Sequence, residues 1–338
     1  MANAAGVTII GATGLVGRQI IETLEEREFP LSNLQLYASP SSAGEEISCG
    51  ALTARVELLD TARFAGTDIV FLAAGAHVSA EWAGRASESG AIVIDTSQLY
   101  VGDPDVPLIV PELNAAALAE VSSRSLVTSP DPVAIAASVA MYPLHQAAGI
   151  RRAVITTFEP VSGAGRAGID ELQQQTLRLM NGQDSEIAVF PQRIAFNVLP
   201  QLGDLLDGGN TEEEAATIAA IGRLLDVVDL PVAVTRVRVP TFFGSALTIN
   251  LETERTIDVE AIRDALRPAP GVLLVDELES GSYPTPADAI GTDATYVGRV
   301  RCNADLSVVD LWLAIDNIRK GSALNAVQIA ELLLRDYL

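Results

Sequence analysis

The chain has 338 residues, enough for about two domains, and 49% of them are hydrophobic, as in ordinary globular proteins. Its 44 acidic and 22 basic side chains leave a formal charge of −22, which disfavours binding to nucleic acid or to anionic lipid. Two cysteines and two histidines, scattered singly, predict neither a disulfide framework nor a metal site. Without a targeting signal or a run of about 18 apolar residues, we expect a cytoplasmic protein with no membrane span.

The first part of the chain alternates short strands with helices. Strands are predicted at residues 7–10, 34–38, 68–73 and 91–95, and helices at residues 18–28 and 79–89. Such alternation is typical of an α/β fold with a doubly wound parallel sheet of the Rossmann type.

The pattern changes after proline-rich breaks at residues 103–107 and 129–132. A buried helix is predicted at residues 133–147, strands at 153–158, 233–239 and 246–252, and helices at 171–180, 211–225 and 325–334. Residues 307–318 fit either a strand or a helix, and Lys320-Gly321 fits a turn. We therefore expect a Rossmann domain of residues 1–132 and 321–338, and a second, α+β domain with a largely antiparallel sheet at residues 133–320.

A G-x-x-G-x-x-G pattern runs from Gly11 through Gly14 to Gly17, directly after a predicted strand and before a predicted helix. Glycines permit a tight turn and the close approach of a pyrophosphate, and the start of the helix supplies N–H donors. The pattern predicts a dinucleotide site, with a purely structural turn as the alternative.

The end of the second predicted strand does not decide which nucleotide is bound. It carries Ser39, Ser41 and Ser42, whereas NAD sites place an acidic residue there and NADP sites an arginine. Arg55 is some distance away along the chain, and hydroxyl groups bind a phosphate weakly compared with a guanidinium. Both NADP and NAD therefore remain open as cofactors.

A second glycine-rich loop begins at Ser162 and Gly163, and it is either a flexible connection or a loop that faces a ligand. Further along, Arg236 and Arg238 alternate along a predicted strand, so both point to the same face. One of them could clamp a carboxylate, or the two could form a solvated or salt-bridged strand face.

Longer motifs make the chain similar to aspartate-β-semialdehyde dehydrogenase over essentially its whole length. They lie at residues 11–17, 105–114, 162–165, 195–200, 238–240, 316–321 and 323–328. The resemblance implies an NADP-dependent homodimer or tetramer, with a second domain that carries the substrate residues and the subunit interface. On this basis we predict cofactor contacts at Gly11, Thr13, Gly14, Leu15, Val16, Ser39, Ser42, Gly75, Ser162 and Gly163.

Two groups that the family chemistry requires are missing. The family uses a cysteine that forms an acyl-enzyme and a histidine that acts as acid and base. The matching positions hold Pro132 and Ser245. Proline offers no nucleophile, and serine is a poor general base near neutral pH.

Other family positions are partly kept. The arginine that binds carboxylate matches Arg238, and the glutamate of the family's E-x-x-K helix is Glu213. The phosphate-binding arginine and lysine match Val101 and Ala216, the glutamine that orients the thioester matches Glu159, and the 2′-phosphate arginine matches Ser41.

This combination is similar to the Usg branch of the family. It predicts a catalytically degenerate homologue, with no catalytic residues, that dimerises and binds NAD(P) or a small acidic metabolite at Glu159, Glu213 and Arg238. Two alternatives remain: an enzyme with altered chemistry that uses Ser245 or Glu159, or a pure assembly protein.

Overall fold

In the computed structural model, residues 4–227, 229–277 and 281–338 are described. The chain divides into two compact units, the first formed by Met1–Asp131 with Ser322–Leu338 and the second by Pro132–Gly321. The last helix therefore returns to the unit in which the chain begins. Within the described segments, no helix is long and apolar enough to cross a membrane.

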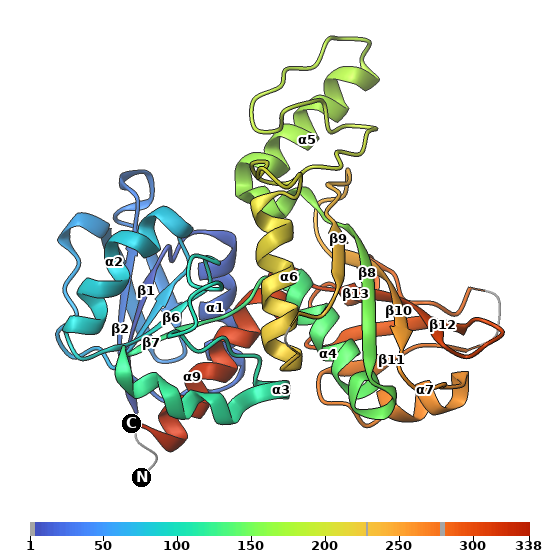
Figure 1. Ribbon diagram of the computed structural model, residues 1–338. Coiled ribbons are helices and arrows are strands. Elements are labelled where there is room, and N and C mark those ends of the chain that lie inside the picture. The colour runs from blue at the N-terminus through green and yellow to red at the C-terminus, as the bar shows by residue number, and fades with distance from the viewer. Residues whose placement is uncertain (1–3, 228, 278–280) are drawn as a thin grey trace. The chain divides into compact units, whose positions relative to one another are not determined.

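The first unit is built on a seven-stranded sheet in the order β3-β4-β2-β1-β5-β6-β7 (Figure 1). Its strands are β1 (Ala5–Ile10), β2 (Leu31–Ala38), β3 (Glu46–Cys49), β4 (Leu52–Leu58), β5 (Ile69–Leu72), β6 (Ile92–Asp95) and β7 (Leu126–Thr128). All neighbours pair in parallel except β3 and β4. The strand order reverses beside β1, so the predicted doubly wound sheet is confirmed.

Helices cover both faces of this sheet. The helices α1 (Leu15–Glu26) and α9 (Asn325–Asp336) bury Ile20 and Val327 in one core with the strands, and α2 (Ala76–Glu88) buries Trp82 in the other. The strands β5 and β6 are buried on both sides, so their sequences are almost continuously apolar, whereas β3 and β4 at the edge are largely exposed.

The second unit contains a six-stranded sheet in the order β11-β12-β13-β10-β8-β9. Its strands are β8 (Ile150–Phe158), β9 (Val232–Thr235), β10 (Ser245–Thr253), β11 (Val272–Leu274), β12 (Thr295–Cys302) and β13 (Val308–Ile315). The central four strands pair antiparallel, as predicted, while β9 and β11 join the edges in parallel. The helix α4 (Pro132–Ala148) packs on one face with α6 (Glu212–Leu225) and α7 (Val259–Leu266), and α5 (Gly165–Met180) builds a smaller core with the segment after it.

Two local predictions need correction. The strand predicted at residues 233–239 ends at Thr235, because the backbone beyond it bonds to two separate segments, at Glu159 and Leu199. The turn predicted at Lys320-Gly321 lies inside a wide helical turn, η5 (Arg319–Leu324), in which Gly321 N–H donates to the Asp316 carbonyl oxygen at 2.9 Å. A Cβ on Gly321 would lie 2.4 Å from the Cβ of Pro132, so close packing on the start of α4 requires glycine there.

Candidate functional site

The glycine-rich turn between β1 and α1 brings three backbone segments together. Gly11 has a φ of +90°, and a Cβ there would lie 2.5 Å from the carbonyl oxygen of Ala73, just after β5. A Cβ on Gly17 would lie 2.1 Å from the Gly11 carbonyl oxygen. Glycine is therefore required at both positions for the turn to close.

The same turn leaves backbone N–H groups open at the start of α1. The N-cap is Gly14, with a φ of −70° and no side-chain cap, and Thr13, Leu15 and Val16 around it are exposed or partly exposed. After β5, Gly75 is likewise the uncapped N-cap of α2. Uncapped amides at the carboxyl edge of a parallel sheet attract anions, so the residues present fit the pyrophosphate of a dinucleotide.

The loop after β2 lies at the same edge of the sheet. The Tyr37 carbonyl oxygen accepts from Gly11 N–H at 2.8 Å, which joins the end of β2 to the glycine-rich turn. Ser39 is the residue before the short helical turn η1 (Pro40–Ser42), and its Oγ lies 2.9 Å from Ser41 Oγ. The first unit thus gathers its predicted cofactor residues, from the loops after β1, β2 and β5, at one edge.

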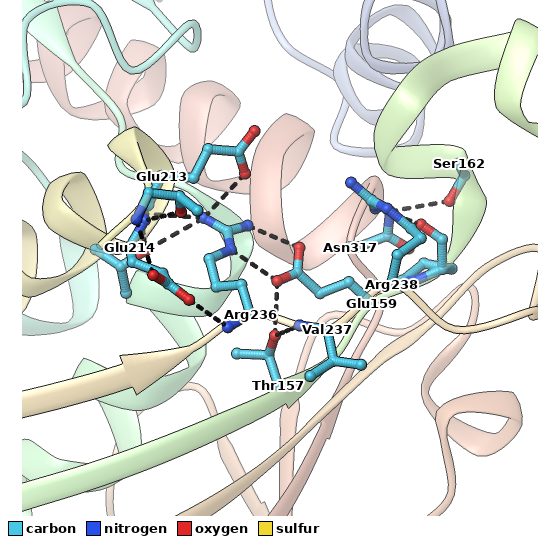
Figure 2. A network of polar contacts seen from close by, with 12 residues as sticks. Thr157, Glu159, Ser162, Glu213, Glu214, Arg236, Val237, Arg238 and Asn317 are labelled. Carbon is cyan, nitrogen blue, oxygen red and sulfur yellow. Dashed lines mark hydrogen bonds and ion pairs between the residues drawn. The ribbon is translucent and has the colours of Figure 1, made fainter. Parts of the chain in front are cut away.

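In the second unit, Ser162 and Gly163 lie in the short turn η4 (Val161–Ala164) that precedes α5. The Asn317 Nδ2 group donates to Ser162 Oγ at 3.1 Å (Figure 2). Asn317 Oδ1 accepts from Gly244 N–H at 3.0 Å. A Cβ on Gly163 would lie 2.4 Å from Nη1 of Arg238. The guanidinium of Arg238 therefore passes directly against this loop, and a side chain at position 163 would displace it.

A buried ion pair occupies the centre of this region. Arg236 binds Glu159 with two parallel contacts, Nε to Oε1 and Nη2 to Oε2, each 2.7 Å long (Figure 2). The two side chains are 7% and 8% exposed. Thr157 Oγ1 also donates to Glu159 Oε1 at 2.7 Å, so both carboxylate oxygens are engaged.

This arrangement determines the charge of Glu159. Burial alone would raise the pKa of the carboxyl group, but Arg236, with help from Arg238 and Thr157, outweighs burial and holds the pKa below its usual range. Glu159 is therefore an ionised hydrogen-bond acceptor near neutral pH, which makes it a poor proton donor.

Arg238 lies beside this pair and makes different contacts. Its side chain is buried, and Nη1 donates to the Pro160 carbonyl oxygen at 2.7 Å. Burial lowers the pKa of Arg238, an effect that Glu159 and Glu213 oppose. One carbonyl oxygen uses one of the five N–H donors of a guanidinium, so the others suit a carboxylate.

Glu213 borders the cluster from α6. Its Oε2 lies 3.3 Å from Arg236 Nη1, and its side chain is 45% exposed. The second unit therefore brings the three predicted substrate residues into one region, which presents both a guanidinium and a partly exposed carboxylate.

The strand pattern alone left Arg236 and Arg238 equivalent, and the resemblance selected Arg238. The structure buries both and gives them different partners, with Arg236 in the salt bridge that had been the alternative. Sequence reasoning missed Thr157, and it missed Glu214, whose Oε1 accepts from Arg236 N–H at 3.0 Å. No local pattern marks these partners. Among the contacting residues that were not predicted as site residues, Asn317 lies in a motif that the sequence had shown, residues 316–321.

Of the positions expected to hold a nucleophile and a base, Pro132 is partly exposed and Ser245 is buried. Pro132 is the first residue of α4, and Ser245 is the first residue of β10, where it is 2% exposed. Neither cysteine is suited to replace the missing nucleophile, because the pKa of each thiol is raised. Burial, with Glu25 nearby, raises the pKa of Cys49 to about 11, and burial together with Asp258 and Asp310 raises the pKa of Cys302.

Comparisons with known proteins agree with this architecture. A model of the semialdehyde dehydrogenase NAD binding domain matches residues 6–121, and a model of the semialdehyde dehydrogenase dimerisation domain matches residues 141–320. The chain is 42% identical to aspartate-semialdehyde dehydrogenase 2 of Vibrio cholerae over 339 residues, with all of both chains covered. The chain belongs to the aspartate-semialdehyde dehydrogenase family.

Other members of the aspartate-semialdehyde dehydrogenase family are nearly as similar. A USG-1 protein homolog from Azotobacter vinelandii is 40% identical over 337 residues, with 99% of each chain covered, which agrees with the similarity to the Usg branch. The crystal structure of aspartate semialdehyde dehydrogenase II from Vibrio cholerae, complexed with ASA, has a TM-score of 0.96 at 41% identity and covers 99% of this chain and 100% of that one. Among the described residues, no group of His, Cys, Asp and Glu is arranged to hold a metal ion.

Proposed function

We propose that this family member binds a nicotinamide dinucleotide and a small acidic metabolite, forms a homodimer, and does not turn over as a dehydrogenase. The observation that carries the proposal is the proline at the nucleophile position. Pro132 has no group that could attack an aldehyde, and it packs closely on Gly321, where a Cβ would lie 2.4 Å from the Cβ of Pro132.

The glutamate at position 159 supports the same conclusion. An altered enzyme would need a group free to exchange a proton, and Glu159 is instead held ionised by Arg236 and Thr157. The contacts of Arg238 and Glu213 suit binding: the guanidinium would hold a carboxylate of the metabolite, and the Glu213 carboxylate would hold a cationic group. When bound, a nicotinamide would supply hydride chemistry, but the chain offers no acyl carrier for it.

An assay of dehydrogenase turnover tests this proposal. Purified protein is incubated with aspartate semialdehyde, phosphate and NADP, and the absorbance of the reduced nucleotide is followed beside the Vibrio cholerae relative as a positive control. We expect no signal above the blank. Phosphate-dependent NADPH formation that follows the protein through purification, and disappears in Arg238→Ala, would contradict the proposal.

The second face of the six-stranded sheet supports the homodimer. Along β10 and β13, Leu247, Ile249 and Leu311 are buried under the helices, whereas Thr248 and Trp312, on the opposite face, retain exposure. This face lies within the region matched by the dimerisation domain. A second copy of the chain is the partner we propose for it.

A further inference from the structure

A pocket lies beside β12, at the face of the six-stranded sheet that the helices leave open. Its volume is about 420 Å³. The residues that line it are Thr248, Tyr283, Arg299, Arg301, Leu311 and Trp312. All of them belong to the second unit, and none is part of the cluster around Glu159 and Arg238. The pocket therefore combines two guanidinium groups with two aromatic rings at a place without a role so far.

A bulge in β12 brings both arginines to the pocket. The pairing of β12 with β13 slips between Gly298 and Arg301, where two residues of β12 stand opposite one residue of β13. Within the bulge Arg299 has a φ of 54°, a left-handed conformation that a side chain rarely adopts. Arg299 and Arg301 are exposed, whereas Val300 between them is buried.

A buried ion pair holds this bulge in place. Val300 N–H donates to Asp276 Oδ1 at 3.0 Å, and Asp276 Oδ2 accepts from Arg263 Nε at 2.8 Å and from Arg263 Nη2 at 2.6 Å. The side chains of Arg263 and Asp276 are 10% and 8% exposed. A left-handed residue persists only where its surroundings fix it, and such residues cluster at binding sites. The strain at Arg299 thus agrees with a binding role for the pocket.

The aromatic wall of the pocket is fixed as well. Trp312 Nε1 donates to the Pro284 carbonyl oxygen at 2.7 Å, which orients the indole and holds the segment that carries Tyr283. A Cβ on Gly298 would lie 2.6 Å from Cδ of Pro284, so glycine allows this segment to pack on β12. Tyr283 itself is 49% exposed. Two aromatic rings therefore border the pocket in a preformed arrangement.

The two arginines of the pocket keep donors for a ligand. Among the described residues no carboxylate forms an ion pair with either of them, and Arg301 Nη1 donates to the Arg299 carbonyl oxygen at 2.6 Å. Asp310, which faces Arg301 across the strands, accepts instead from Asn250 Nδ2 at 2.7 Å. In a chain of net charge −22, two neighbouring arginines without carboxylate partners give a local positive potential that attracts anions.

We propose that this pocket binds a small organic anion that carries a flat ring, such as an aromatic carboxylate or phosphate. Arg299 and Arg301 hold the oxyanion with charged hydrogen bonds, and the ring lies against Trp312 and Tyr283. A volume of about 420 Å³ is within the range of small-ligand sites, about 300–1,000 Å³. The proposal does not depend on the dinucleotide site, because the two sites share no residue.

Isothermal titration calorimetry with phenyl phosphate and with benzoate tests the proposal. Inorganic phosphate lacks the ring and benzyl alcohol lacks the charge, so both should bind at least about tenfold more weakly than phenyl phosphate. Arg299→Gln and Arg301→Gln should each weaken phenyl phosphate at least about tenfold, because each removes a charged hydrogen bond. Arg267→Gln, directly after α7 on the covered face of the sheet, is the matched control and should bind like the wild type.

Tryptophan fluorescence locates the bound ligand. The chain has two tryptophans, and Trp82 is buried in the first unit, so a change on adding phenyl phosphate is expected from Trp312. Trp312→Phe keeps a ring in the pocket and should abolish the fluorescence change while phenyl phosphate still binds. A change that persists in Trp312→Phe, or arginine variants that bind as tightly as the wild type, would overturn the assignment of the pocket.

The oligomeric state is measured beside these titrations. Thr248 and Trp312 also lie on the face that we propose for the homodimer, so a ligand and a second copy cover the same two residues. We therefore expect phenyl phosphate to bind more weakly as the protein concentration rises and the dimer forms in sedimentation. A folded protein that binds no phenyl phosphate at any concentration overturns the pocket. A chain that stays monomeric and binds it overturns only the homodimer.

Discussion

At Glu159 the chain buries a charge and satisfies it fully. Two contacts of 2.7 Å from Arg236 and one from Thr157 replace the water that an exposed carboxylate would bind. Breaking such a pair by removing one partner is far costlier than losing an exposed pair, because the remaining charge stays buried. The ion pair therefore holds Glu159, which lies beside Arg238, in one position and balances its charge.

Replacement of Arg236 tests the cost of this burial. We expect Arg236→Leu to lower the free energy of unfolding by about 3 kcal/mol or more, because it leaves Glu159 buried without its partner. Arg151→Leu removes an exposed partner of Glu252 and should cost much less than Arg236→Leu, because water screens that pair. Urea denaturation measures both. A similar small loss in the two variants would contradict the account, and a second change, Glu159→Leu, should recover most of the loss in Arg236→Leu.

The lowered pKa of Glu159 predicts a pH dependence with a definite sign. A carboxyl whose pKa is lower in the folded state contributes stability above its unfolded pKa of about 4.3, and that contribution is lost as the pH falls through the folded value. The advantage of the wild type over Glu159→Gln should therefore be constant near neutral pH and shrink below about pH 4.3. An advantage that grows as the pH falls would show that Glu159 is protonated in the native protein.

At the scale of elements, the glycines of the turn between β1 and α1 differ in role. Two are needed for the turn to close, and we expect the third to matter for nucleotide binding. Gly11 and Gly17 are needed because a Cβ would collide with backbone, at 2.5 and 2.1 Å. A Cβ on Gly14 would lie 3.2 Å from the Gly11 carbonyl oxygen and 4.0 Å from that of Ala73, and Gly14 has an ordinary φ. A side chain at Gly14 therefore requires a much smaller shift of the turn than one at Gly11 or Gly17.

This difference predicts two distinct outcomes of substitution. Gly14→Asp should abolish dinucleotide binding by charge repulsion while changing the melting temperature little, with Gly14→Ala as the uncharged control. Gly17→Ala should instead lower the melting temperature, because α1 must move away from the turn. Differential scanning fluorimetry and calorimetric titration read the two effects separately. Unchanged nucleotide affinity in Gly14→Asp would mean that the turn is only structural.

At the scale of the whole molecule, the two sheets differ in how they are covered. The first unit buries both faces of its sheet at the central strands, such as β1, β5 and β6, whereas the second leaves one face of β8, β10 and β13 half exposed. Trp312 and Phe158 pack together on that face, with ring centroids 5.8 Å apart. A sheet face with partly exposed aromatic rings suits a self-complementary interface.

The homodimer is tested at Thr248, which is exposed on β10 opposite Trp312. Thr248→Asp would bring like charges together in a two-fold interface, so we expect the dimer dissociation constant to rise at least about tenfold. Sedimentation equilibrium measures it. Ser87→Asp on α2 adds the same charge elsewhere and should leave the dimer intact. A wild type that remains monomeric at high concentration would contradict the homodimer.

Local patterns in the sequence were sufficient for the Rossmann sheet and for the glycine-rich turn. Strand and helix periodicity and the spacing of Gly11, Gly14 and Gly17 depend on residues close in the chain, so they can be read without a fold. Resemblance to the family also placed Pro132 and Ser245, because the identity of a residue at a recognised position needs no coordinates.

Tertiary structure alone decided which charges meet. Glu159 and Arg236 are 77 residues apart, and their pairing depends on β8 and β9 lying side by side. Likewise, Arg55 reaches the loop after β2 only because β4 pairs with β2 and carries the hairpin with it. Local propensity has no information on such contacts, since sheet order and burial, rather than neighbouring residues, determine which side chains share a site.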